Sequence, residues 1–188
     1  MVDVKNLLLE CGAFLQGHFL LSSGKHSDGY VQCAKLLMYP DKAAEVLSIV
    51  TDKVKDLGAD VVIGPAMGGI MVSYELGRQL GLPAMFTERE NDIMTLRRGF
   101  TVKEGQKVLI AEDVVTTGKS SLETIKALEN YGVEVIGLAC MVNRSGLKQI
   151  DKYPIYSAID LDIKTFDEEC PLCDDGVELV KPGSRKKF

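Results

Sequence analysis

The chain has 188 residues, enough for one domain with a sizeable core but short for two. Hydrophobic residues make up 46% and charged residues 26% of it, proportions that exclude a disordered, collagen-like or coiled-coil protein. The formal net charge of -5 excludes a broadly basic nucleic-acid-binding surface, so any anionic ligand has to be held by a local group of residues.

The sequence also carries signals about its compartment. No apolar run approaches the roughly 18 residues that a membrane-spanning helix needs. The first residues, MVDVKNLLLECG, are too acidic and their apolar stretch is too short for a secretory signal. The five cysteines lack the density of a secreted disulfide framework, and we expect them to be reduced. We therefore expect a cytoplasmic protein with no membrane or nucleic-acid partner.

The first part of the chain predicts a helix, a cap and a second helix. A short amphipathic helix is expected at residues 4–9. In residues 13–35 short apolar pairs are mixed with Ser, Gly and Asp, which predicts a hairpin-like cap. An apolar stripe over residues 43–57 predicts a longer helix that ends at Gly58.

Four apolar runs rich in β-branched residues follow, beginning at residues 61, 82, 108 and 135. Continuous runs of this kind are typical of strands buried on both faces, and the spaces between them fit crossover helices. Such helices are predicted at about residues 70–80 and 122–131, while the charged residues 88–106 predict a long exposed loop containing a hairpin. The alternation predicts a doubly wound α/β fold with a mostly parallel sheet.

The most informative segment is VLIAEDVVTTGKSS, residues 108–121. A buried strand there runs into two carboxylates, Glu112 and Asp113, at the edge where open α/β sheets bind ligands. An acidic pair suits ribose hydroxyls if the chain turns directly after it. The loop from Thr116 to Ser120 offers hydroxyls, a glycine and successive amides before a helix, a combination that suits a phosphate.

Plainer interpretations of the same residues stay open. A Walker loop is disfavoured, because Asp113 stands where the first glycine of that motif belongs. Taken separately, Glu112 and Asp113 fit a solvated strand end, and Thr-Thr-Gly-Lys-Ser fits a helix cap. The whole string together favours a site for a phosphorylated sugar.

The string VLIAEDVVTTGKS resembles the signature of the type I phosphoribosyltransferases. Four further segments are similar to the orotate phosphoribosyltransferases of that family: FLLSSGKHSDGY, GPAMGG, the FTEREND to LRRGF stretch, and MVNRSG. The resemblance covers most of the chain. It implies transfer of ribose 5-phosphate from 5-phospho-α-D-ribose 1-diphosphate to orotate, with release of pyrophosphate, in pyrimidine biosynthesis. It also implies a homodimer that requires Mg2+.

The resemblance assigns roles to individual positions of this chain. Glu112 and Asp113 are implied to be the catalytic pair at the ribose hydroxyls. Thr116 and Arg144 are implied to bind orotate, and Arg89 to reach the pyrophosphate bound by a neighbouring subunit. The remaining residues implied to bind phosphoribosyl diphosphate are Val114, Val115, Thr116, Thr117, Gly118, Lys119 and Ser120.

Three departures from the family pattern affect residues near these positions. Gly68 stands where some relatives have a lysine, Ser22 stands where relatives often have one, and residues 90–94 replace a Lys-x-x-Lys-x-His segment. Arg97 and Arg98 are therefore further candidates for the pyrophosphate, although a basic loop is more often a solvated surface.

The resemblance divides the single domain expected over residues 1–188 into three parts. An N-terminal helix and a hood over the base occupy residues 1–40, and the α/β core occupies residues 41–164. A C-terminal extension over residues 165–188 packs on the body or on a partner, and its last basic residues, 185–187, are expected to be frayed.

No dedicated protein metal site is expected. The Mg2+ of the family is held mainly by substrate oxygens and water, as that ion prefers. The segment Cys170-Pro171-Leu172-Cys173 has the spacing of half a zinc site, but no second Cys or His pair with matching spacing is present. His26, a lone histidine in a polar turn, is expected to hydrogen-bond locally.

Two other functions stay open at this point. One is a purine-type phosphoribosyltransferase, which would use the same phosphate chemistry with another base. The other is a non-catalytic regulator that binds phosphoribosyl diphosphate, although the sequence has no helix-turn-helix or basic RNA-binding face to support it.

Overall fold

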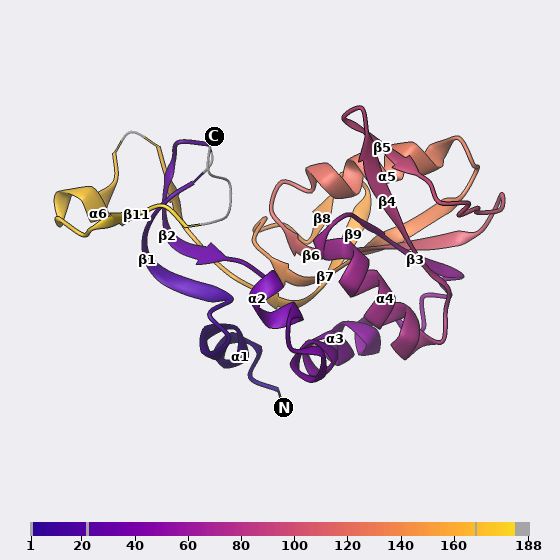
Figure 1. Cartoon of the computed structure of the whole chain (residues 1–188), viewed down its shortest axis with the longest axis horizontal. Helices are drawn as coiled ribbons and strands as arrows, with labels where there is room; N and C mark the ends of the chain where they lie inside the picture. The colour runs from indigo at the N-terminus through magenta and orange to yellow at the C-terminus, as the bar shows by residue number, and fades with distance from the viewer. Residues whose placement is uncertain (1, 22, 168, 183–188) are drawn as a thin grey trace.

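The computed structural model describes residues 2–21, 23–167 and 169–182, which form an α/β core with a smaller sheet beside it (Figure 1). The core sheet has the order β5-β4-β3-β6-β7-β9-β8. Its five central strands run parallel to their neighbours, and β5 and β8 are antiparallel at the two edges. The strands are β3 (Val61–Pro65), β4 (Ala84–Glu90), β5 (Ile93–Leu96), β6 (Lys107–Val115), β7 (Glu134–Asn143), β8 (Gln149–Ile150) and β9 (Tyr153–Asp160). The predicted α/β fold with a mostly parallel sheet is confirmed.

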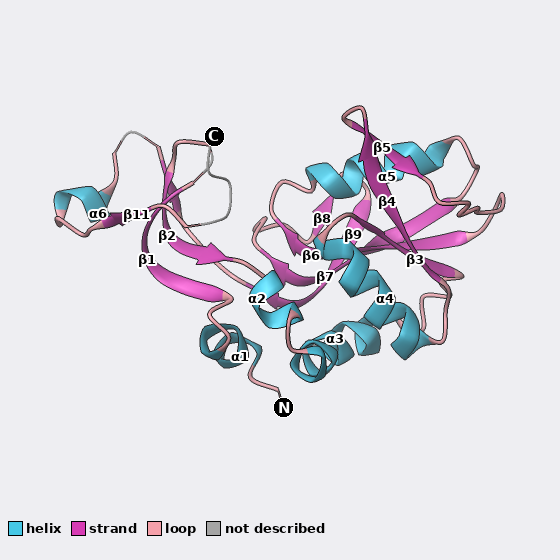
Figure 2. Ribbon diagram, viewed as in Figure 1, coloured by secondary structure: helices cyan, strands magenta, loops and turns pink. Residues whose placement is uncertain are grey.

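Helices cover both faces of this sheet (Figure 2). One face packs against α3 (Pro40–Val54) and α4 (Gly68–Leu80), together with α1 (Val4–Glu10) and α2 (Ala34–Leu37); α5 (Lys119–Glu129) covers the other face. Leu109 and Ile110 are consecutive residues of β6, both fully buried, and they belong to different hydrophobic clusters. Burial on both faces is the reason that the central strands read as unbroken apolar runs. None of the helices in the described part of the chain is long and apolar enough to span a bilayer.

The smaller sheet, which we call the hood sheet, has the order β10-β2-β1-β11. The predicted hairpin forms its centre, as β1 (Phe14–Leu20) and the antiparallel β2 (His26–Val31). Its outer strands, β10 (Thr165–Phe166) and β11 (Leu179–Val180), come from the C-terminal extension, with the one-turn helix α6 (Pro171–Asp174) between them. The extension is therefore part of the hood, and the hood is not confined to residues 1–40.

The structure differs from the sequence prediction in other details. Strand β9 was not predicted, because it includes a proline and a buried serine and has no continuous apolar run. The hairpin expected within residues 88–106 is confirmed, with Asn91 and Asp92 both in the left-handed region between β4 and β5. The irregular segment there is shorter than predicted, covering residues 97–106. The expectations for Ser22 and residues 185–187 lie outside the described residues.

Candidate active site

The two carboxylates of the predicted site lie at the carboxyl end of β6, which is the middle strand of the core sheet. Glu112 and Asp113 are both half-buried. The strand reaches them with its side chains packed on both faces, since Ala111 before them is fully buried. After Asp113 the chain bends, and the amide of Val114 donates to Asp113 Oδ1 at 2.9 Å. This local bond fixes one oxygen of Asp113. Both carboxyl groups therefore lie at the carboxyl end of the central strand.

Burial dominates the electrostatics of this acid pair. It raises the pKa of Glu112 to about 9, with further contributions from the charge of Asp113 and from a hydrogen bond between the two side chains. Burial also raises the pKa of Asp113, against the opposing effect of the Val114 amide. Among the described residues, the buried Oε2 atom of Glu112 has no hydrogen-bond partner. A desolvated acceptor without a partner is suited to a hydroxyl or a cation brought by a ligand.

The glycine-rich turn between β3 and α4 packs directly against this pair. A Cβ atom on Gly68 would lie 2.4 Å from Cγ of Asp113, so a side chain of any kind at this position would overlap the carboxylate. A Cβ atom on Gly64 would lie 2.1 Å from the carbonyl oxygen of Gly69. The glycines therefore allow a close approach of the turn to β6 and to itself.

The loop after β6 exposes the hydroxyl and amine groups predicted to bind phosphate. Thr116, Thr117 and Lys119 are exposed, and Ser120 is half-buried at the start of α5. Gly118 has a φ of +70° and is buried against Ile150, where a Cβ atom would lie 2.4 Å from Ile150 Cδ1. The sharp bend at this glycine directs the chain into α5, so the loop and the first turn of the helix face the same edge as the acid pair.

The side chains of the two valines predicted to bind phosphoribosyl diphosphate pack in the core. Val115 is buried in the cluster beneath α5, and Val114 packs against the cluster on the opposite face. The carbonyl of Val115 accepts from the amide of Arg144 at 2.7 Å. Their position leaves only backbone groups for a ligand, and it fixes the spacing between the loop and Arg144.

Arg144, the predicted orotate ligand, is half-buried after β7 and faces the hood. Burial lowers the pKa of its guanidinium, and the charge of Asp28 is the largest opposing effect. Its buried Nε atom lacks a hydrogen-bond partner within the part of the chain that the structure describes. A cavity of about 500 Å³ borders its loop and residues 160–163. A desolvated cation with an unused donor suits a carboxylate ligand.

The segment that carries Arg144 is held by Asn143 and Asp160, for which the sequence predicted no role. The buried Asn143 donates through Nδ2 to the carbonyl of Leu147 at 2.9 Å and to Asp160 Oδ1 at 3.1 Å. Its Oδ1 accepts from the amide of Ser145 at 3.0 Å. Asp160 ends the strand that was not predicted, so this positioning network could not be assembled from the sequence.

A cysteine connects the hood hairpin to the acid pair. The buried Sγ atom of Cys33 donates to the carbonyl of Asp113 at 3.5 Å, and burial raises its thiol pKa well above the ordinary value. On β2 the neighbouring Asp28 accepts from the amide of Lys164 at 2.9 Å. Cys33 is thus a contact that the sequence did not indicate, and it sets the distance between the hood and the end of β6.

The three arginines of the charged segment pair with acids of their own chain. Arg89 forms an ion pair with Glu123 of α5 and donates to the carbonyl of Asp92 at 3.0 Å. Arg97 and Arg98 pair with acids of β4, respectively Glu90 at 3.1 Å and Glu88 at 3.0 Å. The structure therefore places Arg89 beside α5 and does not join it to Glu112 or Asp113. Its expected contact in a neighbouring subunit stays a prediction.

The raised pKa of Glu112 makes a prediction for the pH dependence of stability. The folded carboxyl keeps its proton up to about pH 9, whereas in the unfolded chain it ionises near 4.5. Between these values the folded state binds more protons, so the free energy of unfolding falls as pH rises, by at most about 1.4 kcal/mol per pH unit from this group. Glu112→Gln removes that loss. We expect it to be more stable than the parent by about 1–2 kcal/mol near pH 8 and equal near pH 4.

Urea unfolding followed across this pH range measures the difference. Glu134→Gln, which changes an exposed carboxylate at the other end of the sheet, is the matched control and should follow the parent at every pH. A Glu112→Gln variant that is less stable than the parent near pH 8, or a difference independent of pH, would contradict the burial of this charge.

Comparison with known proteins agrees with this geometry. A family model described as a phosphoribosyl transferase domain matches residues 38–174, which include the acid pair, the loop and Arg144. A curated orotate phosphoribosyltransferase from Caldicellulosiruptor bescii is 53% identical over 179 residues, covering 95% of this chain and 94% of that protein.

Solved structures share the fold at lower sequence identity. The UMP synthase of Leishmania donovani aligns with a TM-score of 0.72 at 23% identity over 85% of this chain, which spans 36% of that longer protein. The orotate phosphoribosyltransferase of Aeropyrum pernix aligns with a TM-score of 0.67 at 24% identity, over 84% of this chain and 93% of its own. An adenine phosphoribosyltransferase from Thermoanaerobacter pseudethanolicus gives 0.62 at 18% identity, over 71% and 88%. The domain match and the 53% identity across nearly the full length of both chains show that this chain belongs to the orotate phosphoribosyltransferases, within the phosphoribosyltransferase family.

Proposed function

We propose that this chain transfers the phosphoribosyl group of 5-phospho-α-D-ribose 1-diphosphate to orotate by means of the acid pair, the following loop and Arg144. The bond between the anomeric carbon and the pyrophosphate oxygen breaks, and its electron pair leaves with pyrophosphate. A ring nitrogen of orotate bonds to the same carbon and loses its proton. The products are orotidine 5′-monophosphate and pyrophosphate. The observation that carries the proposal is the desolvated acid pair directly before an exposed, amide-rich loop.

In this proposal Glu112 and Asp113 accept hydrogen bonds from the ribose hydroxyls. The unpartnered Oε2 of Glu112 gains a donor when the sugar binds. As the bond to pyrophosphate breaks, the ribose ring gains positive charge. This charge favours ionisation of the buried carboxyl groups, and the carboxylate that forms stabilises it more strongly where water is excluded. No covalent enzyme intermediate is needed, because positioning and fixed charge are sufficient for this displacement.

The loop from Thr116 to Ser120 binds the 5′-phosphate. Exposed Thr116 and Thr117 offer hydroxyl donors, and exposed Lys119 offers an ammonium group. The amides in the first turn of α5 and the dipole of this 11-residue helix favour an anion at the same place. The phosphate and the ribose are then held by consecutive residues of one segment.

Orotate lies between Arg144 and the hood. The guanidinium can form two parallel hydrogen bonds with the orotate carboxylate, and its unused Nε donor is available for one of them. Thr116 is the second orotate contact in this proposal. Because the network of Asn143 and Asp160 holds the Arg144 segment, the base is presented to the anomeric carbon in a fixed orientation.

Magnesium fits this arrangement as an ion carried by the substrate. Mg2+ prefers oxygen ligands and retains part of its water, and the acid pair offers a buried oxygen without a partner among the described groups. Glu112 and Asp113 would hold the ion through the ribose hydroxyls that they bind. When present, Mg2+ neutralises charge on the departing pyrophosphate.

A homodimer in the cytoplasm completes the proposal. Arg89 of one subunit would neutralise the pyrophosphate in the other, and its present pairing with Glu123 does not prevent this. The Arg89 side chain is 42% exposed, and exposed ion pairs are worth at most about 1 kcal/mol, so the guanidinium can exchange partners. The five cysteines are all within the described residues and all free, which suits a reducing compartment.

The assay of this function uses the purified chain with phosphoribosyl diphosphate, Mg2+ and orotate. Loss of orotate absorbance and matching release of pyrophosphate are the expected results. Adenine, guanine and xanthine in separate reactions test the purine-type alternative, and turnover with one of them in preference to orotate would replace the proposed base. Binding of phosphoribosyl diphosphate without pyrophosphate release would instead favour a regulator.

Asp113→Asn tests the acid pair. The amide keeps the oxygen that accepts from Val114, so we expect the free energy of unfolding to change by less than about 1 kcal/mol. The lost charge should lower kcat by roughly 100-fold or more. Steady-state kinetics and urea unfolding measure the two effects, and a fully active variant would remove Asp113 from the ribose site.

Gly68→Ala tests the contact between the glycine turn and the acid pair. The new methyl group would lie 2.4 Å from Asp113 Cγ, so the carboxylate or the turn has to move. We expect kcat/KM for phosphoribosyl diphosphate to fall by roughly 10-fold or more, because small displacements at a reacting centre are costly. Met67→Ala, at the adjacent and 80% exposed position, is the control and should keep most of the activity. Equal kinetics for the two variants would show that the turn tolerates a side chain here.

Arg144→Ala tests the base site. Because Arg144 faces orotate in the proposal, its removal should raise the KM for orotate by about 10-fold or more and change the KM for phosphoribosyl diphosphate much less. Arg78→Ala is the control, since Arg78 lies on α4 in an exposed pair with Glu75. Equal increases in both KM values would exclude Arg144 from the orotate pocket.

A further inference from the structure

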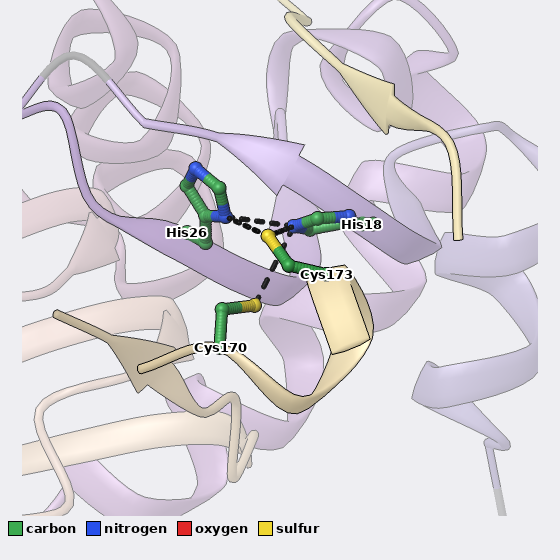
Figure 3. Close-up of side chains that lie close together, drawn as sticks. All are labelled: His18, His26, Cys170 and Cys173. Carbon is green, nitrogen blue, oxygen red and sulfur yellow. Dashed lines mark hydrogen bonds between the residues drawn. The ribbon is translucent and has the colours of Figure 1, made fainter. Parts of the chain in front are cut away.

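Four side chains with metal-binding atoms meet at the hood, away from the residues assigned to catalysis. His18 lies on β1, His26 on β2, and Cys170 and Cys173 frame the start of α6 (Figure 3). One ligand atom from each lies within 4.8 Å of the other three. Figure 3 shows the two imidazole rings and the two sulfur atoms converging on one point from the hairpin and from the C-terminal extension.

The distances fit a tetrahedral ion. Cys173 Sγ lies 3.3 Å from His26 Nδ1, and His18 Nε2 lies 3.5 Å from Cys170 Sγ and 3.7 Å from Cys173 Sγ. With zinc bonds of about 2.3 Å to sulfur and about 2.0–2.1 Å to nitrogen, the sulfur–nitrogen edges of a tetrahedron are roughly 3.6 Å. The 2.8 Å between His18 Nε2 and His26 Nδ1 is shorter than the corresponding nitrogen–nitrogen edge of roughly 3.3 Å, so the rings would separate slightly around an ion.

Local backbone structure places each pair of ligands. The amide of Cys173 donates to the carbonyl of Cys170 at 2.9 Å, a tight turn that brings both sulfur atoms to the same side. In the hairpin, His26 pairs with Leu20, and the register shifts between Gln16 and Phe19, where His18 lies. A bulge of this kind changes the direction of a side chain, and here the side chain of His18 points toward His26.

A second contact fixes the tautomer of His18. Its Nδ1 atom lies 2.8 Å from the carbonyl oxygen of Val177, an acceptor that requires the proton on Nδ1. The lone pair of Nε2 then faces the cluster. Metal-binding histidines regularly donate their other ring N–H to a carbonyl or carboxylate in this way. His18 is only 2% and Cys170 only 4% exposed, so these ligand groups are withdrawn from water.

Within the described residues, the other contacts between the C-terminal extension and the hood are mostly polar: the pairing of the two-residue strands β10 and β11, and the exposed ion pair of Lys25 with Asp167 at 2.6 Å. Helix α6 contains no buried residue, and Leu179 and Val180 of the two-residue strand β11 are 41% and 46% exposed. So little buried apolar surface is a weak basis for holding a segment in place. A simple hydrogen bond between two histidines would need neither of the cysteines, whereas a metal ion accounts for all four side chains.

We propose that His18, His26, Cys170 and Cys173 bind one zinc ion that fastens the C-terminal extension to the hood hairpin. Two thiolates and two imidazoles favour zinc over magnesium or calcium, and four protein ligands leave no open position for catalysis. Zinc was disfavoured from the sequence because no second Cys or His pair with matching spacing is present. The structure supplies that pair from the hairpin, where His18 is 152 residues from Cys170.

The ion also has a consequence for the base site. The β2 strand that carries His26 also carries Asp28, whose charge acts on Arg144. A zinc ion bound to His26 would therefore limit how far β2, and with it the hood, can move from Arg144. Zinc would thus be structural, with an indirect effect on orotate binding.

Metal content is the first test, and it needs no substrate, so its result is independent of the proposed function. The chain is purified without a histidine tag and under reducing conditions, then analysed by inductively coupled plasma mass spectrometry before and after incubation with zinc and gel filtration. We expect about one zinc per chain. Less than about a tenth of an equivalent after incubation, or iron or nickel in place of zinc, would overturn the proposal.

Variants and a spectroscopic probe locate the ion. Cys173→Ser changes an exposed ligand and Cys170→Ser with Cys173→Ser removes both sulfurs, while Cys11→Ser changes a free cysteine outside the cluster and is the control. Cobalt(II) in the parent and in Cys11→Ser should give the visible bands of a tetrahedral ion and thiolate-to-cobalt charge transfer. The double variant should bind less than about a tenth of an equivalent of either metal. Full zinc binding by the double variant would overturn the site.

The oxidation state of the two sulfurs separates the proposal from a disulfide. Thiol titration of the denatured protein, after release of the metal and without added reductant, should find both Cys170 and Cys173 free. Limited proteolysis should cleave the segment of residues 169–182 faster in the chelated protein and in the double variant than in the parent and in Cys11→Ser. A Cys170–Cys173 disulfide in protein that carries no zinc would overturn the proposal.

Discussion

Withdrawal of two carboxylates from water at the end of β6 is the constraint on which the rest of this structure depends. Glu112 and Asp113 lie on the middle strand of a sheet covered on both faces, with the backbone of Gly68 against Asp113 and Cys33 on its carbonyl. Each of these contacts removes solvent that would otherwise stabilise negative charge. The result is the raised pKa of both groups.

Two acid groups that are kept away from water need a rigid support, and the core provides it. The strand that carries the acid pair is anchored by fully buried side chains, Leu109 and Ile110 of β6 and Leu138 of the adjacent β7. The strand therefore cannot shift without opening the centre of the sheet. Because burial disfavours their charged forms, these two acids lower the free energy of unfolding of the protein without a ligand. In the proposed function, a ligand that donates hydroxyl groups to these acids would remove that disadvantage, and this would favour a sugar at the site.

The second half of the site depends on the hood, which is much smaller than the core. Arg144 is held from the core side by Asn143 and Asp160, and on its other side it faces residues of β2. The hood sheet is completed by two short strands from the far end of the chain. A sheet of this size buries little apolar surface, and the cluster of His18, His26, Cys170 and Cys173 lies where a cross-link would compensate for it.

The α/β core and the hairpin could be predicted from the sequence, and so could the position of the acid pair and its loop at the end of a buried strand. Strands buried on both faces are continuous apolar runs, and Glu112, Asp113 and Thr116 to Ser120 are neighbours along the chain, so their order was enough to predict them. Arg144 was predicted only through a resemblance, and the inward orientation of Val114 and Val115 was not foreseen. Tertiary structure alone decided the β9 strand, the network of Asn143 with Asp160, the joining of the extension to the hood, and the meeting of His18 with Cys170. These features unite residues far apart in sequence, and no local periodicity or spacing encodes which distant segments the folded core brings together.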